Sequence, residues 1–98
     1  MEKDRLIQIL AVFIETQGKD ESVAALLPPD TEFERRFGNL NHFRTAFAWS
    51  LEDWILEQFA GNEQWEDLAE TLSWADDDWT EAQWQKCFEN LKRKRLFL

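Results

Sequence analysis

Few residues of this 98-residue chain have types and spacings that could do chemistry. His42 is the only histidine, and no nucleophile motif surrounds it, so a general base at this position has little support. Cys87 is the only cysteine; it lies beside Phe88 on an apolar stripe, where a cysteine usually packs as a small hydrophobic side chain. We therefore predict no catalytic residue and no cofactor site.

Three consecutive aspartates, Asp76, Asp77 and Asp78, offer oxygen ligands for a hard cation together with Glu81. A calcium-binding EF-hand loop needs a glycine at its sixth position and a glutamate at its twelfth, and here the twelfth position would be Cys87. We expect a solvated turn that brings negative charge to the start of the next helix, and no metal site. A small metal-dependent enzyme is the third function class, and it would require residues 76–81 to bind a divalent ion.

Residues 45–85 contain all six tryptophans and eleven of the twenty acidic residues, but no lysine or arginine. A helix surface whose charges serve only to stabilise the helix usually carries both positive and negative side chains, because opposite charges at i, i+4 attract and like charges repel. Carboxylates at this spacing lie roughly 5–6 Å apart, which is comparable with the ~3.4 Å axial spacing of phosphates along a DNA strand. Such rows can present a phosphate-like array to a basic groove; the alternative is an ordinary solvated acidic face.

We predict that the partner-binding residues are the acidic side chains of this stretch together with two tryptophans that a small core need not hold. An exposed tryptophan flanked by acidic residues is typical of an interface hot spot. Trp54, Trp65 and Trp84 are expected to build the core instead, and Trp49 is a further tryptophan that the core need not accommodate. The predicted partner-binding residues are Glu63, Glu66, Asp67, Glu70, Trp74, Asp76, Asp77, Asp78, Trp79 and Glu81.

Charge is distributed unevenly along the chain, whose net charge is −9. Residues 1–85 carry −13 and residues 86–98 carry +4. An acidic body argues against direct binding to nucleic acid or to an anionic membrane, and it favours a basic protein partner, including a nucleic-acid-binding protein.

The basic C-terminal tail, residues 92–98, has four bases followed by three apolar residues. It could be a nucleic-acid patch, a localisation signal or a docking peptide. The favoured interpretation is that its charges complement the dipole of the last helix and face the acidic body. Leu98 lies seven residues after Leu91, so a helix that continued to the end would pack this apolar end on the core.

The elements that position these residues are predicted to be helices. Three glycines and two prolines are too few to form the turns between many strands, and the β-branched residues are too scattered to form strands. A chain of this length buries roughly two thirds of its unfolded surface around one core. We therefore expect a single all-α domain over residues 1–98, a compact bundle of five to six helices without significant β-sheet.

Apolar spacing and capping residues predict where these helices lie. One continuous helix through the middle of the chain is favoured, and a break near Ser50 is the alternative. Gly18 is expected at the C′ position after the first helix. The first helix is apolar on several sides, so it is either central to the bundle, which we favour, or part of a homodimer contact. The predicted helices are residues 4–17, 20–27, 31–37 and 39–61, a helix capped by Asn62, and a helix from Thr80 to about Arg95.

The leading functional hypothesis is a non-enzymatic acidic protein-binding module, in its most concrete form an inhibitor or immunity protein that covers a basic surface of its partner by charge mimicry. The alternative is a helical adaptor that resembles death-fold modules in helix count and length alone and acts through homotypic or self-association. A lone cysteine, no signal-peptide cleavage site and no apolar run near the ~20 residues of a membrane span lead us to expect a cytoplasmic protein.

Overall fold

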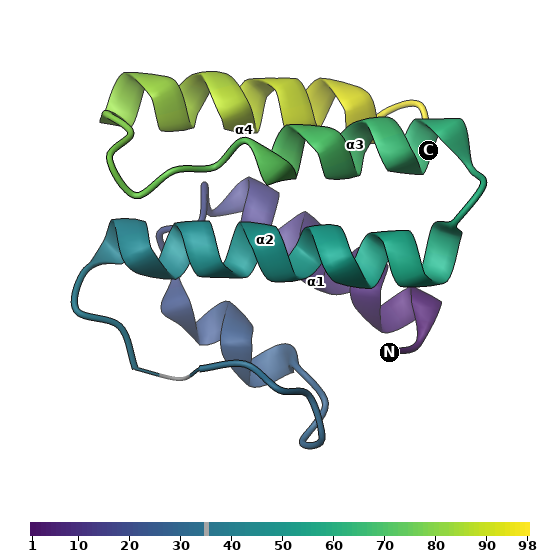
Figure 1. The fold of residues 1–98 in the computed structure, drawn as a ribbon, viewed down its shortest axis with the longest axis horizontal. Coiled ribbons are helices and arrows are strands. Elements are labelled where there is room, and N and C mark those ends of the chain that lie inside the picture. Colours follow the sequence, from purple (N-terminus) through teal and green to yellow (C-terminus); the bar gives the residue numbers. More distant parts are fainter. Residues whose placement is uncertain (35) are drawn as a thin grey trace.

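The computed structural model describes residues 1–34 and 36–98, which form four α-helices and one 3₁₀-helix and contain no strand (Figure 1). The all-helical prediction is confirmed. No helix in these residues is both long enough and apolar enough to cross a membrane. In chain order the elements are α1 (Lys3–Glu15), η1 (Glu21–Leu26), α2 (Leu40–Phe59), α3 (Glu63–Ser73) and α4 (Glu81–Arg95).

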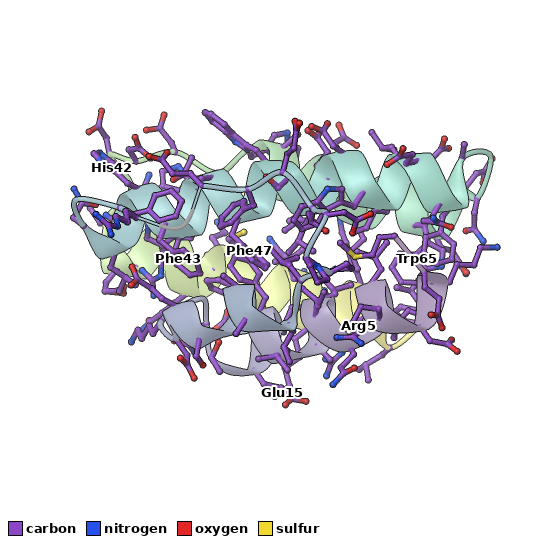
Figure 2. All side chains as sticks on the ribbon, turned by 90° about the horizontal axis from the view of Figure 1, so that it is seen from below. Arg5, Glu15, His42, Phe43, Phe47 and Trp65 are labelled. Carbon is purple, nitrogen blue, oxygen red and sulfur yellow. The ribbon has the colours of Figure 1, made fainter. Side chains whose placement is uncertain are left out.

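Helices α2, α3 and α4 run antiparallel to one another in succession, and α1 crosses behind α2 (Figure 1). α2 packs on α3, α3 packs on α4, and α1 contacts α2, α4 and η1. The connection from α3 to α4 lies at one end of this arrangement, and the C-terminus lies at the other (Figure 1). Phe43 and Phe47 of α2 point into the shared core, whereas Glu15 points away from it (Figure 2).

Side-chain caps begin the last three helices at the predicted positions. Asn39 accepts a hydrogen bond from the backbone N–H of His42 at 2.9 Å, and Asn62 accepts one from Gln64 at 3.1 Å. Thr80 and Gln83 form a complete capping box, in which each side chain accepts from the other residue's backbone N–H. Helix α2 is continuous, so a break near Ser50 is wrong.

The helix predicted for residues 31–37 does not form in the residues that the structure describes there, 31–34 and 36–37; residue 35 lies outside them. Phe33 and Phe37 nevertheless pack on the core: both rings contact Phe43, and Phe33 also lies against Phe47 and Trp54. A helix this short is marginal in water, since isolated helices need roughly 12–15 residues. Contacts of the aromatic rings with α2 therefore outweigh the local capping signal.

The end of α1 corrects the prediction for Gly18. Thr16 is the C-cap, so the C′ residue is Gln17, which adopts a left-handed φ of 54°. Gln17 N–H donates to Ile14 O at 3.1 Å and Gly18 N–H donates to Phe13 O at 2.8 Å, the two bonds of a Schellman motif. Glycine is required at position 18 for other reasons. Its φ is +65°, and a Cβ there would lie 3.0 Å from both Arg44 Cγ and Phe13 Cε1.

Replacing Gly18 with alanine is expected to lower the free energy of unfolding by about 1–3 kcal/mol, because the methyl group would overpack the core at a residue whose φ is +65°. Urea denaturation measures the change. The matched control is Gly38→Ala, since a Cβ at Gly38 meets no atom within 4 Å. Equal stability of the two variants would contradict this account of Gly18.

Candidate protein-interaction surface

The four acidic residues of α3 lie on its outer surface. Glu63, Glu66, Asp67 and Glu70 are all exposed, while Trp65, Leu68, Ala69, Thr71 and Leu72 are buried. This division follows from the helical period, which separates the two sets around the helix axis. Trp74 follows Glu70 by four residues and is 60% exposed, so it extends the acidic row of α3.

Helix α2 adds apolar and acidic side chains next to this row. Trp49 is 50% exposed, and its indole Nε1 donates to the backbone oxygen of Ala75 at 3.1 Å, which places it over the residue that follows Trp74. Leu56 lies seven residues after Trp49 and is also exposed, and Asp53 lies between them on the same side. Sequence reasoning missed Leu56, although its spacing from Trp49 on the side opposite Leu51 and Ile55 could have revealed it.

A side-chain contact joins the two helices on this surface. The hydroxyl of Ser73 on α3 lies close enough to the carboxyl of Glu52 on α2 to affect its pKa, and it donates a hydrogen bond to Glu70 O at 2.5 Å. Partial burial, and then the negative charge of Asp53, raise the pKa of the Glu52 carboxyl, while the hydroxyl of Ser73 acts in the opposite direction. We call the surface side chains of these two helices the acidic face; Glu52 is half-buried and the others are exposed. Its residues are Trp49, Glu52, Asp53, Leu56, Glu63, Glu66, Asp67, Glu70 and Trp74.

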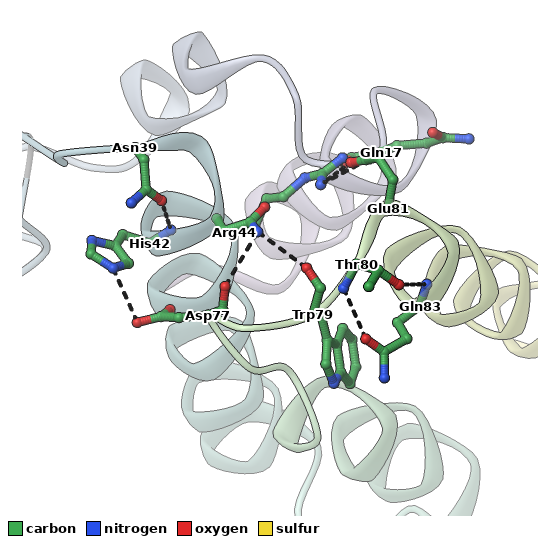
Figure 3. A network of polar contacts seen from close by, with 10 residues as sticks. Gln17, Asn39, His42, Arg44, Asp77, Trp79, Thr80, Glu81 and Gln83 are labelled. Atoms are coloured by element: carbon green, nitrogen blue, oxygen red, sulfur yellow. Dashed lines mark hydrogen bonds and ion pairs between the residues drawn. The ribbon is translucent and has the colours of Figure 1, made fainter.

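The aspartate turn that follows α3 is held in place by the start of α2 (Figure 3). Asn41 Nδ2 donates to the backbone oxygens of Asp77 and Trp79, at 3.2 Å each. His42 Nε2 lies 3.4 Å from Asp77 Oδ2, and Asp76 Oδ1 accepts from the N–H of Asp78 at 2.8 Å. Within residues 1–34 and 36–98, no group of three His, Cys, Asp or Glu side chains is arranged to hold a metal ion.

Glu81 forms an internal ion pair, which sequence reasoning did not foresee. Its carboxylate accepts hydrogen bonds from Nη1 of Arg44, a residue that is only 1% exposed. The hydrogen bond from Arg44 holds the pKa of Glu81 below its usual range, although half of the glutamate side chain faces solvent. Arg44 Nε donates to Gln17 O at 3.1 Å, and the guanidinium carbon lies 5.1 Å from the centre of the Trp84 ring.

No local signal in the sequence marks Arg44 as buried. Arg44 directly precedes residues 45–85, which contain no lysine or arginine, and it lies on the turn of α2 that faces α1 and α4. Its hydrogen-bond partners are 27 and 37 residues away in the chain. Its Nη2 has no hydrogen-bond partner in the part of the chain that the structure describes. The nearby rings of Trp84 and Phe88 supply cation–π contacts instead.

Several more of the predicted partner-binding residues have contacts within the chain. Asp67 Oδ1 lies 3.1 Å from Lys94 Nζ, which also donates to Thr71 Oγ1 at 2.7 Å. Asp77 pairs with His42, and the ring of Trp79 stands edge-on to that of Trp84 with centroids 4.9 Å apart. Glu66 Oε2 accepts a hydrogen bond from the N–H of Gly61 at 3.3 Å, so Glu63, Glu70, Trp74 and Asp78 are the predicted residues with the freest side chains on the surface.

A groove of about 340 Å³ separates α3 from α4 near the connection between them, and we call it the α3–α4 groove. Cys87 in this groove is buried, and the loss of solvent raises the pKa of its thiol to about 11 against a weaker opposing effect of Lys94. The thiol is therefore protonated and unreactive at neutral pH. The lining residues are Thr71, Trp74, Trp79, Gln83, Lys86, Cys87 and Asn90.

The basic tail has two parts in the structure. Lys94 pairs with Asp67 and Arg95 with Glu15, so part of the positive charge faces the acidic body. The helix that would have placed Leu98 on the core does not continue to the end: α4 ends at Arg95, and the N–H groups of the last three residues bond to carbonyls three residues back. This tighter turn rotates the apolar side chains away from the Leu91 stripe, and Leu96 is 78% and Phe97 69% exposed.

Comparison of the chain with protein-family models, with curated proteins and with solved structures gives no match.

Proposed function

We propose that this chain is a non-enzymatic protein-binding module whose acidic face docks on a basic surface of a protein partner. The most concrete form is an inhibitor or immunity protein that covers a nucleic-acid-binding surface by charge mimicry. The observation that carries the proposal is the outer surface of α3. This helix contributes four carboxylates and no base, one of the four, Asp67, is paired with Lys94 of α4, and the row leads to the exposed Trp74.

The arrangement of charge supports a cationic partner. Neighbouring carboxylates on α3 repel one another, which costs stability, and a basic surface would turn this repulsion into attraction. Partial burial is the main reason that the pKa of Glu52 is raised, and the negative charge of Asp53 on the same face raises it further. Spacings of roughly 5–6 Å along the helix let such a row follow a groove that binds nucleic acid phosphates.

The exposed tryptophans give this surface apolar anchors among its charges. Trp49 and Trp74 lie at the end of the α2–α3 pair where Ala75 accepts the indole hydrogen bond of Trp49. Tryptophan is enriched among the residues whose truncation costs an interface the most binding free energy. Binding through charge alone would be weak, and the complex would dissociate quickly. Indole rings buried at the interface would give the complex a defined register and a longer lifetime.

Affinity capture followed by measurement tests the proposal. The immobilised chain is loaded with host lysate at low salt, and a protein retained by the wild type is purified and titrated against the chain by calorimetry over a salt series. We expect the Kd to increase steeply with ionic strength, and a short DNA duplex to displace the chain if the partner surface binds nucleic acid. Affinity that does not change with salt, or the absence of any basic partner, would refute the proposal.

A further inference from the structure

Two of the six tryptophans, Trp49 and Trp74, pack against no other aromatic ring in the part of the chain that the structure describes, and both are at least half exposed. The other tryptophans all lie beside a second ring, with centroids between 4.0 and 6.4 Å apart: Trp54, Trp65, Trp79 and Trp84. Exposed apolar surface of this kind marks interaction sites in soluble proteins. The ring faces of Trp49 and Trp74 are therefore available to a partner.

These two rings lie near each other, and each has a carboxylate close by. Helix α3 ends beside the middle of α2 (Figure 1), where the indole Nε1 of Trp49 donates to the backbone oxygen of Ala75 at 3.1 Å. Asp53 follows Trp49 by four residues and Glu70 precedes Trp74 by four, and both carboxylates are exposed. At a rise of 1.5 Å per residue, each acidic residue is about 6 Å along the helix axis from its indole. The acidic face thus combines negative charges with exposed flat rings.

This combination resembles a single strand of nucleic acid more than a duplex. In a duplex the base faces are stacked inside, and a protein meets phosphates and the edges of the bases. A single strand also exposes its base faces, and the proteins that bind it combine a positively charged groove with aromatic side chains on which the bases stack. Carboxylates alone would suffice to mimic a duplex, whereas the two exposed indoles have a role only in mimicry of unpaired bases.

We propose that the acidic face mimics single-stranded nucleic acid and that the basic partner is a protein whose groove binds single strands, which rests on the proposed function and names the class of its partner. The carboxylates of α3 take the positions of phosphates beside the lysines and arginines of that groove. The rings of Trp49 and Trp74 stack on the aromatic side chains that otherwise hold bases. An indole suits this role because it is a flat bicyclic ring, as a purine is, and stacking tolerates any π-face.

The charges around Trp74 indicate the side from which the partner approaches. Trp74 also lines the α3–α4 groove, and the base in the lining of that groove, Lys86, belongs to α4. Residues 45–85, which include all of α3, contain no lysine or arginine. A positively charged groove is attracted to α2 and α3 and repelled by Lys86. The partner therefore reaches the Trp74 ring across the acidic face and not through the α3–α4 groove.

Competition between two oligonucleotides tests the class of the partner. The basic partner captured by the chain is kept in complex with the fluorescently labelled chain, and anisotropy follows its release at a fixed salt concentration. Oligothymidylate should displace the chain at a concentration of phosphates about tenfold lower than a DNA duplex of equal length, because only the single strand competes for the stacking positions. Displacement by the duplex at an equal or lower concentration, or by neither oligonucleotide, would overturn the inference.

Two double variants distinguish stacking from a simple apolar contact. Trp49→Phe with Trp74→Phe keeps aromatic faces, whereas Trp49→Leu with Trp74→Leu keeps apolar side chains without them. Both remove the bond from Trp49 to Ala75 and leave the net charge unchanged, so each is the matched control of the other. We expect the leucine variant to bind the partner about tenfold more weakly than the phenylalanine variant, with the same salt dependence.

Both positions are on the surface, so both variants should fold, and circular dichroism checks this. Equal affinity of the leucine and phenylalanine variants would mean that the rings are only apolar anchors, and it would overturn the proposed mimicry of bases.

The same measurements separate this inference from the proposed function. If the partner binds with a salt-dependent Kd but a single strand displaces the chain no better than a duplex, only the assignment to single strands fails. If no basic partner binds the chain, the proposed function fails and the inference fails with it.

Discussion

Replacing Glu81 with glutamine is expected to lower the free energy of unfolding by about 1–3 kcal/mol, because Arg44 would remain charged in the interior without its carboxylate. Removing one partner of a fully buried ion pair costs about 3–5 kcal/mol. We expect less here because half of the Glu81 side chain is exposed and solvent screens the charge. Thermal unfolding should show the loss as a Tm decrease of roughly 4–8 °C per kcal/mol for a domain of this size.

A double-mutant cycle identifies the buried charge as the cause. Arg44→Met removes the charge and fills the space with an apolar side chain, so it should cost less than Glu81→Gln, and adding Glu81→Gln to it should have little further effect. The matched control is Glu89→Gln, which changes an exposed glutamate on the same helix. If Glu81→Gln destabilises the wild type and the Arg44→Met background equally, the buried guanidinium is not responsible.

The same ion pair predicts how stability depends on pH. The pKa of Glu81 is lower in the folded state than its ordinary value of 4.5, so its contribution is present above pH 4.5 and is lost as the pH decreases through the folded pKa. Asp20 also has a lowered pKa and Glu52 a raised one, but both are common to wild type and variant. The stability difference between wild type and Glu81→Gln should therefore shrink as acid is added below pH 4.5.

Reversing two charges of the acidic face is expected to weaken binding to the basic partner by at least tenfold, which is about 1.4 kcal/mol. The variant is Glu66→Lys with Glu70→Lys, two exposed positions one turn apart on α3. Each lysine removes an attraction and adds a repulsion, so the slope of log Kd against log salt should also decrease. Trp74→Ala should reduce affinity separately by about 30-fold, or 2 kcal/mol, if this indole is a hot spot.

A control with the same change in net charge distinguishes a local from a global electrostatic effect. Glu21→Lys with Glu89→Lys alters two exposed glutamates of η1 and α4, outside α2 and α3. This control should retain affinity within about threefold, since charges far from the interface act mainly through screened long-range attraction. Circular dichroism checks that both variants fold, because Glu66 also accepts a bond from the N–H of Gly61. Equal loss of binding in the two variants would remove the acidic face from the proposal.

The sequence alone determined the boundaries of most helices, because the signals that set them are local. Asn39, Asn62 and the Thr80–Gln83 pair cap helices by bonds to residues two or three positions away. The acidic row on α3 was predictable for the same reason, since the helical period fixes which residues share a side. A sequence pattern can specify contacts between residues that are only a few positions apart in the chain.

Only the tertiary structure decided which of these features are free on the surface. It keeps residues 31–34 and 36–37 out of a helix because the rings of Phe33 and Phe37 pack on α2. It also pairs Glu81 with Arg44, a residue 37 positions away, and it leaves Trp49, Leu56 and the last three residues, Leu96, Phe97 and Leu98, exposed. Each outcome depends on which distant residue occupies the neighbouring space, and local propensity contains no information about that residue.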